Sequence, residues 1–243
     1  MEIPPLLIII IVLALVFDYI NGFHDSANSI ATIVSTKVLT PFQAVLWAAF
    51  FNFVAFFISK YLIGEFKVGN TIAKAINENF ITLEVILSAL IAAITWNLIT
   101  WWYGIPSSSS HTLLGGLIGA ALVHAGSFAV SGVDVINYVK VIPVIIFIFL
   151  APLIGMFMAF FITIIIVNLF KRSNPTKADR WFKRMQLVSS AMFSLGHGGN
   201  DAQKVMGIIG AAVIYFHVHA GHTEWIESTD KFNLFVDQWA WVP

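Results

Sequence analysis

Two short polar stretches interrupt long apolar runs in this sequence. The first, at 21–29, reads NGFHDSANS, and a weaker echo at 196–204 reads GHGGNDAQK. Polar and ionisable groups at membrane depth are costly, so they usually face a bundle interior or an ion path. The two stretches therefore predict a functional site to which two related segments of the chain contribute.

The acids of these stretches predict a cation site. Asp25 and Asp201 are pure acceptors when ionised, so at membrane depth each needs a cation, a proton or a donor network. Lys204 stands three residues after Asp201 and can pair with it on a helix, whereas Asp25 has no such partner in its own segment. This imbalance predicts bound Na⁺, a bound proton or a divalent metal, because hard cations take oxygen ligands.

Neutral donors near the acids predict an oxyanion as the second ligand. Pro106 breaks the chain before a run of hydroxyl residues and thus predicts a new helix N-terminus, whose dipole favours anions. We expect hydroxyls, amides and free N–H groups to meet the anion without a fixed positive charge. A cation held by the acids would offset the anion's charge, so both ions should move together, as in a symporter. The donors are Asn28, Asn200, Ser107, Ser108, Ser109, Ser110 and Thr112.

The composition restricts the class of protein. Hydrophobic residues make up 58% of the chain and charged residues 11%, against about 25% charged in a soluble globular protein. We therefore expect an all-α polytopic membrane protein. A formal net charge of zero argues against nucleic acid as a partner, and the absence of cysteine excludes disulfides and thiolate metal sites, so no metal site is firmly assigned.

Apolar length predicts how the chain crosses the bilayer, since a crossing needs about 20 residues. Residues 24–36 should dip into the membrane and return, and residues 104–123 should cross after the break. Six of the thirteen basic residues lie in a predicted loop at 171–184, which places this loop in the cytoplasm and the N-terminus outside after five crossings. Apolar runs fall near 5–23, 42–63, 81–103 and 139–169, and another opens at 185–197.

A weak internal repeat predicts inverted topology. A shift of 176 residues (201 − 25) aligns the two acids and also pairs Gly22 with Gly198. Such repeats place ion and substrate sites on discontinuous helices near the membrane midplane. The counterpart of the Pro106 break would lie beyond residue 243, so we expect the second repeat to be incomplete and the chain to be a truncated product. The expected parts are 1–170, the first transmembrane repeat; 171–184, the basic loop; and 185–243, the start of the second repeat.

Three motifs, taken in order, resemble the signatures of the inorganic phosphate transporter (PiT) family. They are residues 21–29, residues 106–112, which read PSSSSHT, and residues 196–204, and the likeness extends over nearly the whole chain up to Tyr215. The resemblance implies a transporter and not an enzyme. It further implies uptake of phosphate or metal–phosphate with Na⁺ or H⁺, by alternating access in a homodimer of the bacterial inner membrane, without a further cofactor.

The resemblance also assigns residues, which are carried over motif by motif. Lys204 stands where the first motif has Asn28, so the two ion sites should differ. A histidine flanks each motif, and His24, His111 and His197 are candidates for a proton relay or for packing. The implied cation ligands are Asp25, Asn28, Asn200 and Asp201, and the implied phosphate contacts are Ser108, Ser109, Ser110 and Thr112 with Asn28 and Asn200.

Three other functions remain open on the sequence alone. One is a transporter or channel for another oxyanion such as sulfate. A passive anion channel needs no buried acid pair, so Asp25 and Asp201 argue against it. The last is an intramembrane hydrolase with a serine among 107–110 as nucleophile and His111 or His197 as base. Adjacent Ser and His on one backbone rarely reach the required geometry, which argues against this enzyme.

Overall fold

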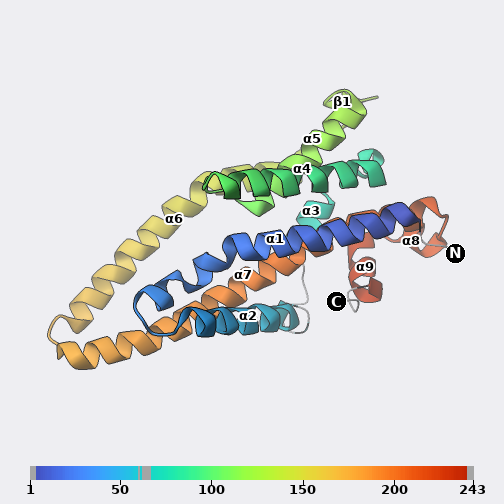
Figure 1. Ribbon diagram of the computed structural model, residues 1–243. Helices are drawn as coiled ribbons and strands as arrows, with labels where there is room; N and C mark the ends of the chain where they lie inside the picture. The colour runs from blue at the N-terminus through green and yellow to red at the C-terminus, as the bar shows by residue number, and fades with distance from the viewer. Residues whose placement is uncertain (1–3, 60, 62–66, 240–243) are drawn as a thin grey trace.

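The computed structural model describes residues 4–59, 61 and 67–239, and this part of the chain is almost entirely helical (Figure 1). The α-helices are α1 (Pro5–Ser35), α2 (Pro41–Ile58), α3 (Lys67–Ala73), α4 (Leu83–Trp102), α5 (Ser109–Ala125), α6 (Tyr138–Phe170), α7 (Pro175–His219), α8 (Thr223–Glu227) and α9 (Lys231–Trp239). A 3₁₀ turn, η2 (Glu78–Phe80), precedes α4, and a small antiparallel hairpin, β1 (Ala129–Val130) with β2 (Val133–Asp134), follows α5.

Four of these helices, α1, α2, α4 and α6, are long and apolar enough to cross a membrane. The predicted runs at 81–103 and 139–169 are confirmed as α4 and α6, and the run at 42–63 is confirmed as α2 up to Ile58, while residues 60, 62 and 63 lie outside the described residues. In the most apolar 18-residue window of α6 no residue is buried inside the protein. Its 33 residues would extend about 50 Å at 1.5 Å per residue, so α6 suits a full crossing in contact with lipid.

Local sequence signals define where several helices begin. Thr40 accepts from the backbone of Gln43 and the side chain of Gln43 accepts in return, which completes a capping box at the start of α2. Thr82 caps α4 and Asn174 caps α7 through backbone N–H groups of their first turns. These caps satisfy donors that the helices themselves cannot.

Helices α1 and α7 run without interruption through the two polar stretches, so the expectation of broken helices there is wrong. Residues 24–36 do not dip and return but continue α1 to Ser35, and α7 already begins at Pro175. Gly198 of the second stretch serves helix packing. A Cβ on Gly198 would lie 2.5 Å from Cα of Asn52, so this glycine allows α7 and α2 to approach closely.

The re-entrant element lies instead at α4 and α5. Gly104, with a φ of +66°, turns the chain between them, and Ser109 at the tip contacts Asn21 and Lys204, which lie in the interior of α1 and α7. Figure 1 shows α4 beside the N-terminal half of α1 and α5 leading away from it toward β1, with the tip at mid-length of the bundle. The predicted crossing at 104–123 is therefore wrong, because the turn between α4 and α5 lies against the middle of α1 and α7 and not at an end of the bundle.

The apolar core joins this helical hairpin to the long helices. Ile10 and Phe17 of α1, Leu90 of α4, Leu113 of α5 and Ile208 of α7 are all buried in one cluster. Within a bilayer, where lipid is as apolar as these side chains, they stabilise the bundle through close packing. The core therefore holds the tip of α4–α5 against the middle of α1 and α7.

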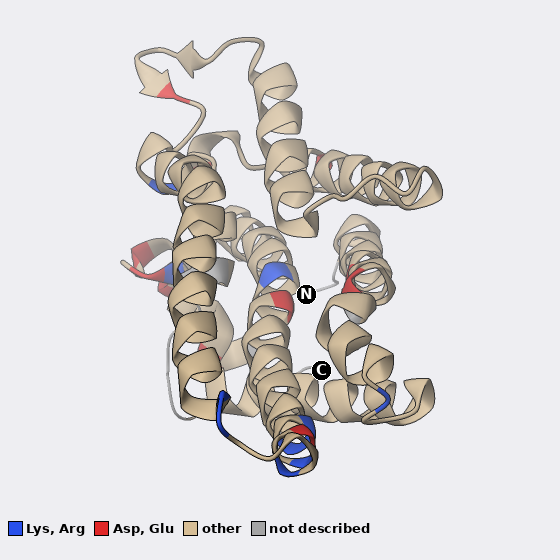
Figure 2. Cartoon of the chain, turned by 90° about the vertical axis from the view of Figure 1, so that its left-hand side faces the viewer, with Lys and Arg blue, Asp and Glu red and all other residues tan. Residues whose placement is uncertain are grey.

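Basic residues gather where α6 passes into α7, at the end of the molecule that faces the viewer in Figure 2. The predicted loop 171–184 is wrong as a loop, because only residues 171–174 form the turn and residues 175–184 are already helical. The first turns of α7 thus continue the helix beyond the apolar bundle and carry most of this charge. One internal ion pair, Lys183 with Asp179 at 3.0 Å, lies on this segment.

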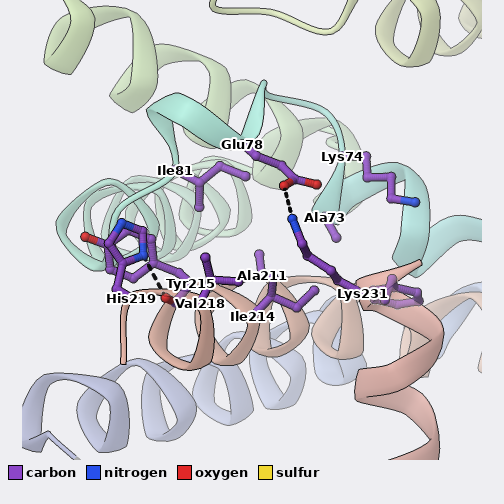
Figure 3. A pocket seen from close by; sticks show the side chains of 11 residues that line it. Ala73, Lys74, Glu78, Ile81, Ala211, Ile214, Tyr215, Val218, His219 and Lys231 are labelled. Carbon is purple, nitrogen blue, oxygen red and sulfur yellow. Dashed lines mark hydrogen bonds and ion pairs between the residues drawn. The ribbon is translucent and has the colours of Figure 1, made fainter. Parts of the chain in front are cut away.

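The C-terminal helices fold back onto α7 and η2. Lys231 of α9 reaches Glu78 of η2 at 2.6 Å across a small cavity of about 60 Å³, and their side chains point toward one another in Figure 3. Phe232 of α9 is buried against Gly210 of α7, where a Cβ would lie 3.0 Å from the phenyl ring. The cavity is otherwise mostly apolar, so it contributes to packing in this region.

Candidate functional site

Asp25 of α1 and Asp201 of α7 meet at one imidazole. Nε2 of His197 lies 3.9 Å from Oδ2 of Asp25 and 3.0 Å from Oδ2 of Asp201. One ligand atom from each of the three residues lies within 4.8 Å of the others, and all three side chains are partly buried. Two carboxylates and an imidazole at this spacing can hold a proton or a metal cation.

The direction of the helices brings these acids together. Figure 1 shows α1 and α7 side by side with opposite chain directions, and the two helices are in contact. A second link is the hydroxyl of Ser190, which donates to the carbonyl of Ser29 at 3.0 Å. Opposite directions are what an inverted repeat requires, so the arrangement agrees with that prediction at the only pair of corresponding helices in the described residues.

Lys204 places a fixed positive charge beside the acids. Its ammonium lies 2.7 Å from Oδ1 of Asp201, which confirms the pair predicted from the sequence spacing. It also donates to Oγ of Ser109 at 3.1 Å, and Ser109 donates to Oδ1 of Asn21. Lys204 is only 5% exposed. A fixed positive charge thus lies beside the neutral donors expected from the sequence, because the ammonium is bonded to a hydroxyl at the tip of the hairpin.

The serine-rich turn is ordered by its own hydroxyls. Ser108 is the N-cap of α5 without a side-chain cap, and its carbonyl accepts from Oγ1 of Thr112 at 2.9 Å. Oγ of Ser107 lies 3.3 Å from the same Thr112 hydroxyl. Ser109 is buried, Ser110 is half-buried and Ser108 is exposed. Of the four predicted phosphate contacts in this turn, Ser109 therefore lies nearest the charged cluster.

The other predicted site residues divide into two groups. Asn28 donates to Oδ1 of Asp25 at 3.5 Å, and Nδ1 of His24 lies 4.0 Å from the same oxygen, so both belong to the cluster. Asn200 is exposed on α7 next to Asp201, and His111 is exposed on α5. The described structure thus gathers five of the predicted residues, Asp25, Asn28, Asp201, His24 and His197, and adds Ser109 through Lys204.

A cavity of about 200 Å³ adjoins the cluster between α1, α2 and α7. His197 and Asp201 line it together with Gly22, Ser29 and Asn52. Oδ1 of Asn52 is buried and has no hydrogen-bond partner among the described residues. A free carbonyl oxygen beside a carboxylate is a further ligand for a hard cation.

Sequence reasoning did not assign Asn52 or Asn21 to the site. Asn52 lies inside an apolar run, and only the close approach of α2 to Gly198 brings it to the cavity. Asn21 belongs to the first motif, and its contact with Ser109 spans 88 residues of sequence. The one usable signal for Asn21 was its place one turn before Asp25 on the same helix.

The fold and the site define a polytopic helical membrane protein that encloses ionisable side chains between two antiparallel helices. A family model described as "Phosphate transporter family" matches residues 21–239 of this chain. The chain therefore belongs to the phosphate transporter family. The members that it resembles are transporters and not enzymes, which removes the hydrolase alternative.

Several relatives are named as probable low-affinity inorganic phosphate transporters. The protein of Rhizobium meliloti is 49% identical over 212 residues, which cover 87% of this chain and 60% of the relative. The protein of Bacillus subtilis is 45% identical over 229 residues, with 91% and 65% covered. That of Streptomyces halstedii is 39% identical over 196 residues, with 79% and 86% covered. The chain thus spans about 60–65% of the length of the first two relatives.

A solved structure has the same fold. It is titled "The sodium-dependent phosphate transporter" and superposes with a TM-score of 0.74 at 22% identity, covering 96% of this chain and 75% of that chain. At this identity the likeness concerns the fold. It agrees with an all-α membrane architecture that includes a re-entrant helical hairpin.

Proposed function

We propose that this protein takes up inorganic phosphate by secondary active symport with Na⁺ or H⁺, through alternating access. The observation that carries the proposal is the junction of Asp25 and Asp201 at His197, from two helices of opposite direction. The names of the relatives supply the substrate. Asp25 and Asp201 together with the ammonium of Lys204 leave one negative charge, which a monovalent cation or a proton neutralises. Asp18 is a further acid within electrostatic range of Asp201 and Lys204.

In this proposal the coupling cation binds between the two carboxylates. Asn28 positions Asp25 through their hydrogen bond, and Oδ1 of Asn52 adds a neutral oxygen from the cavity wall. Asn200 completes the shell from α7 when the cluster closes. If the coupling ion is H⁺, His197 holds the proton between the carboxylates and His24 passes it on. His111, being exposed, serves as the entry for protons from solvent.

Phosphate binds at the start of α5, next to the cation. Ser108, Ser109, Ser110 and Thr112 bring hydroxyls to a helix N-terminus, where free N–H groups and the dipole favour an oxyanion. Asn28 and Asn200 supply amide donors from the side of the cation. A divalent metal that travels with phosphate would meet the same carboxylates, so transport as a metal–phosphate complex uses the same site.

The membrane arrangement follows from the helices and the positive-inside rule. Three full crossings, α1, α2 and α6, precede the basic turn at 171–174, and α4–α5 enters and returns. An odd number of crossings places the N-terminus outside if the basic turn is cytoplasmic. We infer a multi-pass protein of the bacterial inner membrane that works as a homodimer.

Uptake into proteoliposomes tests the proposal. Liposomes that contain the purified protein should accumulate radiolabelled phosphate under an imposed Na⁺ or H⁺ gradient, and separate Na⁺, H⁺ and Mg²⁺ series identify the coupling ion. Excess sulfate should not reduce uptake. Phosphate entry that is indifferent to both gradients would indicate a passive channel, and inhibition by sulfate equal to that by phosphate would indicate a general oxyanion carrier.

A further inference from the structure

Lys204 begins a chain of two hydrogen bonds in which each group donates to the next. The ammonium donates to Ser109, and the hydroxyl of Ser109 donates to Oδ1 of Asn21. An ammonium has three N–H donors, and among the described residues Lys204 forms one hydrogen bond, to Ser109, and one ion pair, with Asp201. One donor is therefore left for a ligand at the place where α5 begins.

Asn21 ends this chain of hydrogen bonds, and its amide N–H groups have no acceptor among the described residues. The residue is only 1% exposed. A buried N–H group without a partner costs free energy that a ligand oxygen can offset. The unpaired amide belongs to the same group that accepts from Ser109, so it lies at the tip of the α4–α5 hairpin.

The N-terminus of α5 faces the same place. Ser108 does not cap the helix with its side chain, so backbone N–H groups of the first turn are open to an anion. A buried ammonium, a buried amide and a helix N-terminus converge there from α7, α1 and α5. An anion with several acceptor oxygens, such as phosphate, matches this set of donors.

The ammonium of Lys204 cannot pair closely with the carboxylate of Asp201 and with a bound oxyanion at the same time. In the structure it neutralises Asp201 at 2.7 Å, while its other contact is the neutral Ser109 at 3.1 Å. An oxyanion bound at Ser109 would draw the ammonium away from the carboxylate. Asp201 would then stand beside Asp25 with only His197 between them, and two uncompensated carboxylates attract a cation.

We propose that Lys204 is an electrostatic switch, which pairs with Asp201 when the transporter is empty and with phosphate when it is loaded. This inference rests on the proposed function and adds the order of events. Phosphate takes the ammonium from Asp201 and thereby creates the cation site. By reciprocity the bound cation increases the affinity for phosphate by the same factor. Lys204 is thus a binding residue for phosphate and the link through which the two ions are coupled.

Equilibrium binding of radiolabelled inorganic phosphate to the purified protein, at fixed pH and without Na⁺, tests the switch. Asp201→Asn removes the competitor for Lys204, so it should increase phosphate affinity about tenfold. Asp25→Asn removes the same charge nearby but no Lys204 contact, so its gain should be no more than about twofold. Equal gains from the two variants would overturn the proposal, and so would a loss of affinity in Asp201→Asn.

A second pair of variants isolates the role of Lys204. Lys204→Gln should weaken phosphate binding at least tenfold, and Asp201→Asn should then have no effect in the Lys204→Gln background. A gain that persists without Lys204 would overturn the switch. If Lys204→Gln does not fold, the comparison of the two aspartate variants decides alone. Absence of phosphate binding by the folded unmutated protein would instead overturn the proposed function.

Discussion

Ser109 is set apart from the other hydroxyls of its turn by its contacts. It is buried and bonded to Lys204 and Asn21, whereas Ser108 next to it is exposed. The resemblance assigned both serines the same role. The structure therefore distinguishes residues that the motif treats as equivalent, because burial depends on how the tip of α4–α5 docks between α1 and α7.

We predict unequal effects when these serines are replaced. Ser109→Ala should weaken phosphate binding about tenfold, since it removes a buried hydroxyl that bonds to a charged group. Ser108→Ala should change it less than about threefold, because an exposed hydroxyl is readily replaced by water. Phosphate dissociation constants of the two purified variants measure the difference, and a larger loss in Ser108→Ala would contradict the assignment.

Some contacts of the site can be predicted from the sequence and others cannot. Lys204 and Asp201 are three positions apart on one helix, so their pairing follows from helical geometry alone. The contact of Lys204 with Ser109 spans 95 residues and depends on the packing of three helices. The motifs therefore predicted the types of residue at the site, whereas the contacts between them could be identified only from the folded structure.

At the scale of the elements, glycine in α7 serves helix packing. Gly198 lies against the backbone of Asn52 in α2, whereas a Cβ on Gly196 would meet no atom within 4 Å. The close approach of α2 holds Asn52 at the wall of the cavity beside Asp201. Gly198 thus affects both the packing of α2 on α7 and the position of Asn52 at the cavity.

This coupling gives a prediction about stability. Gly198→Ala should destabilise the protein by about 1–3 kcal/mol, because the added methyl group forces α7 away from α2. Gly196→Ala should be neutral or stabilising by up to about 1 kcal/mol, since alanine is the better helix former. Thermal unfolding in detergent compares them, and equal unfolding temperatures for both variants would show that the approach of α2 is not tight.

Apolar length predicted α2, α4 and α6 within a few residues at most described ends, because the polar residues inside them, such as Asn52 and Asn97, are isolated. It failed at α1 and α7, where polar residues at 21–29 and 196–204 read as breaks. A helix satisfies its own backbone, so polar side chains on one face do not end it when they bond to a neighbouring helix. The partners at these two places lie on the other helix and in α5, out of reach of any local pattern.

At the scale of the molecule, the chain is a set of long antiparallel helices with the α4–α5 hairpin packed on one side and ending at mid-length (Figure 1). The basic turn at 171–174 and the β1–β2 hairpin lie at the two ends of α6, which is long enough to span the bilayer. We therefore expect these two segments to lie on opposite sides of the membrane. The five crossings expected from the sequence and the three proposed from the helices give the same orientation.

Cysteine labelling tests this orientation directly, because the chain contains no cysteine. Ser173→Cys in the basic turn should react with a membrane-impermeant maleimide only from the cytoplasmic side. Ser131→Cys in the hairpin should react only from outside, and both positions are exposed. Labelling of both from one side would contradict the crossing by α6, and an exchange of the two sides would reverse the assigned orientation.

The account depends most on Asp25 as part of the coupling site, and gradient-driven phosphate uptake by Asp25→Asn proteoliposomes is its most direct test. We predict that this variant inserts and folds but does not accumulate phosphate under an imposed Na⁺ or H⁺ gradient, because one of the two cation-binding carboxylates is lost. Asp134→Asn, on the exposed hairpin, is the matched control and should accumulate phosphate normally. Accumulation by Asp25→Asn at the level of the unmutated protein would contradict the account.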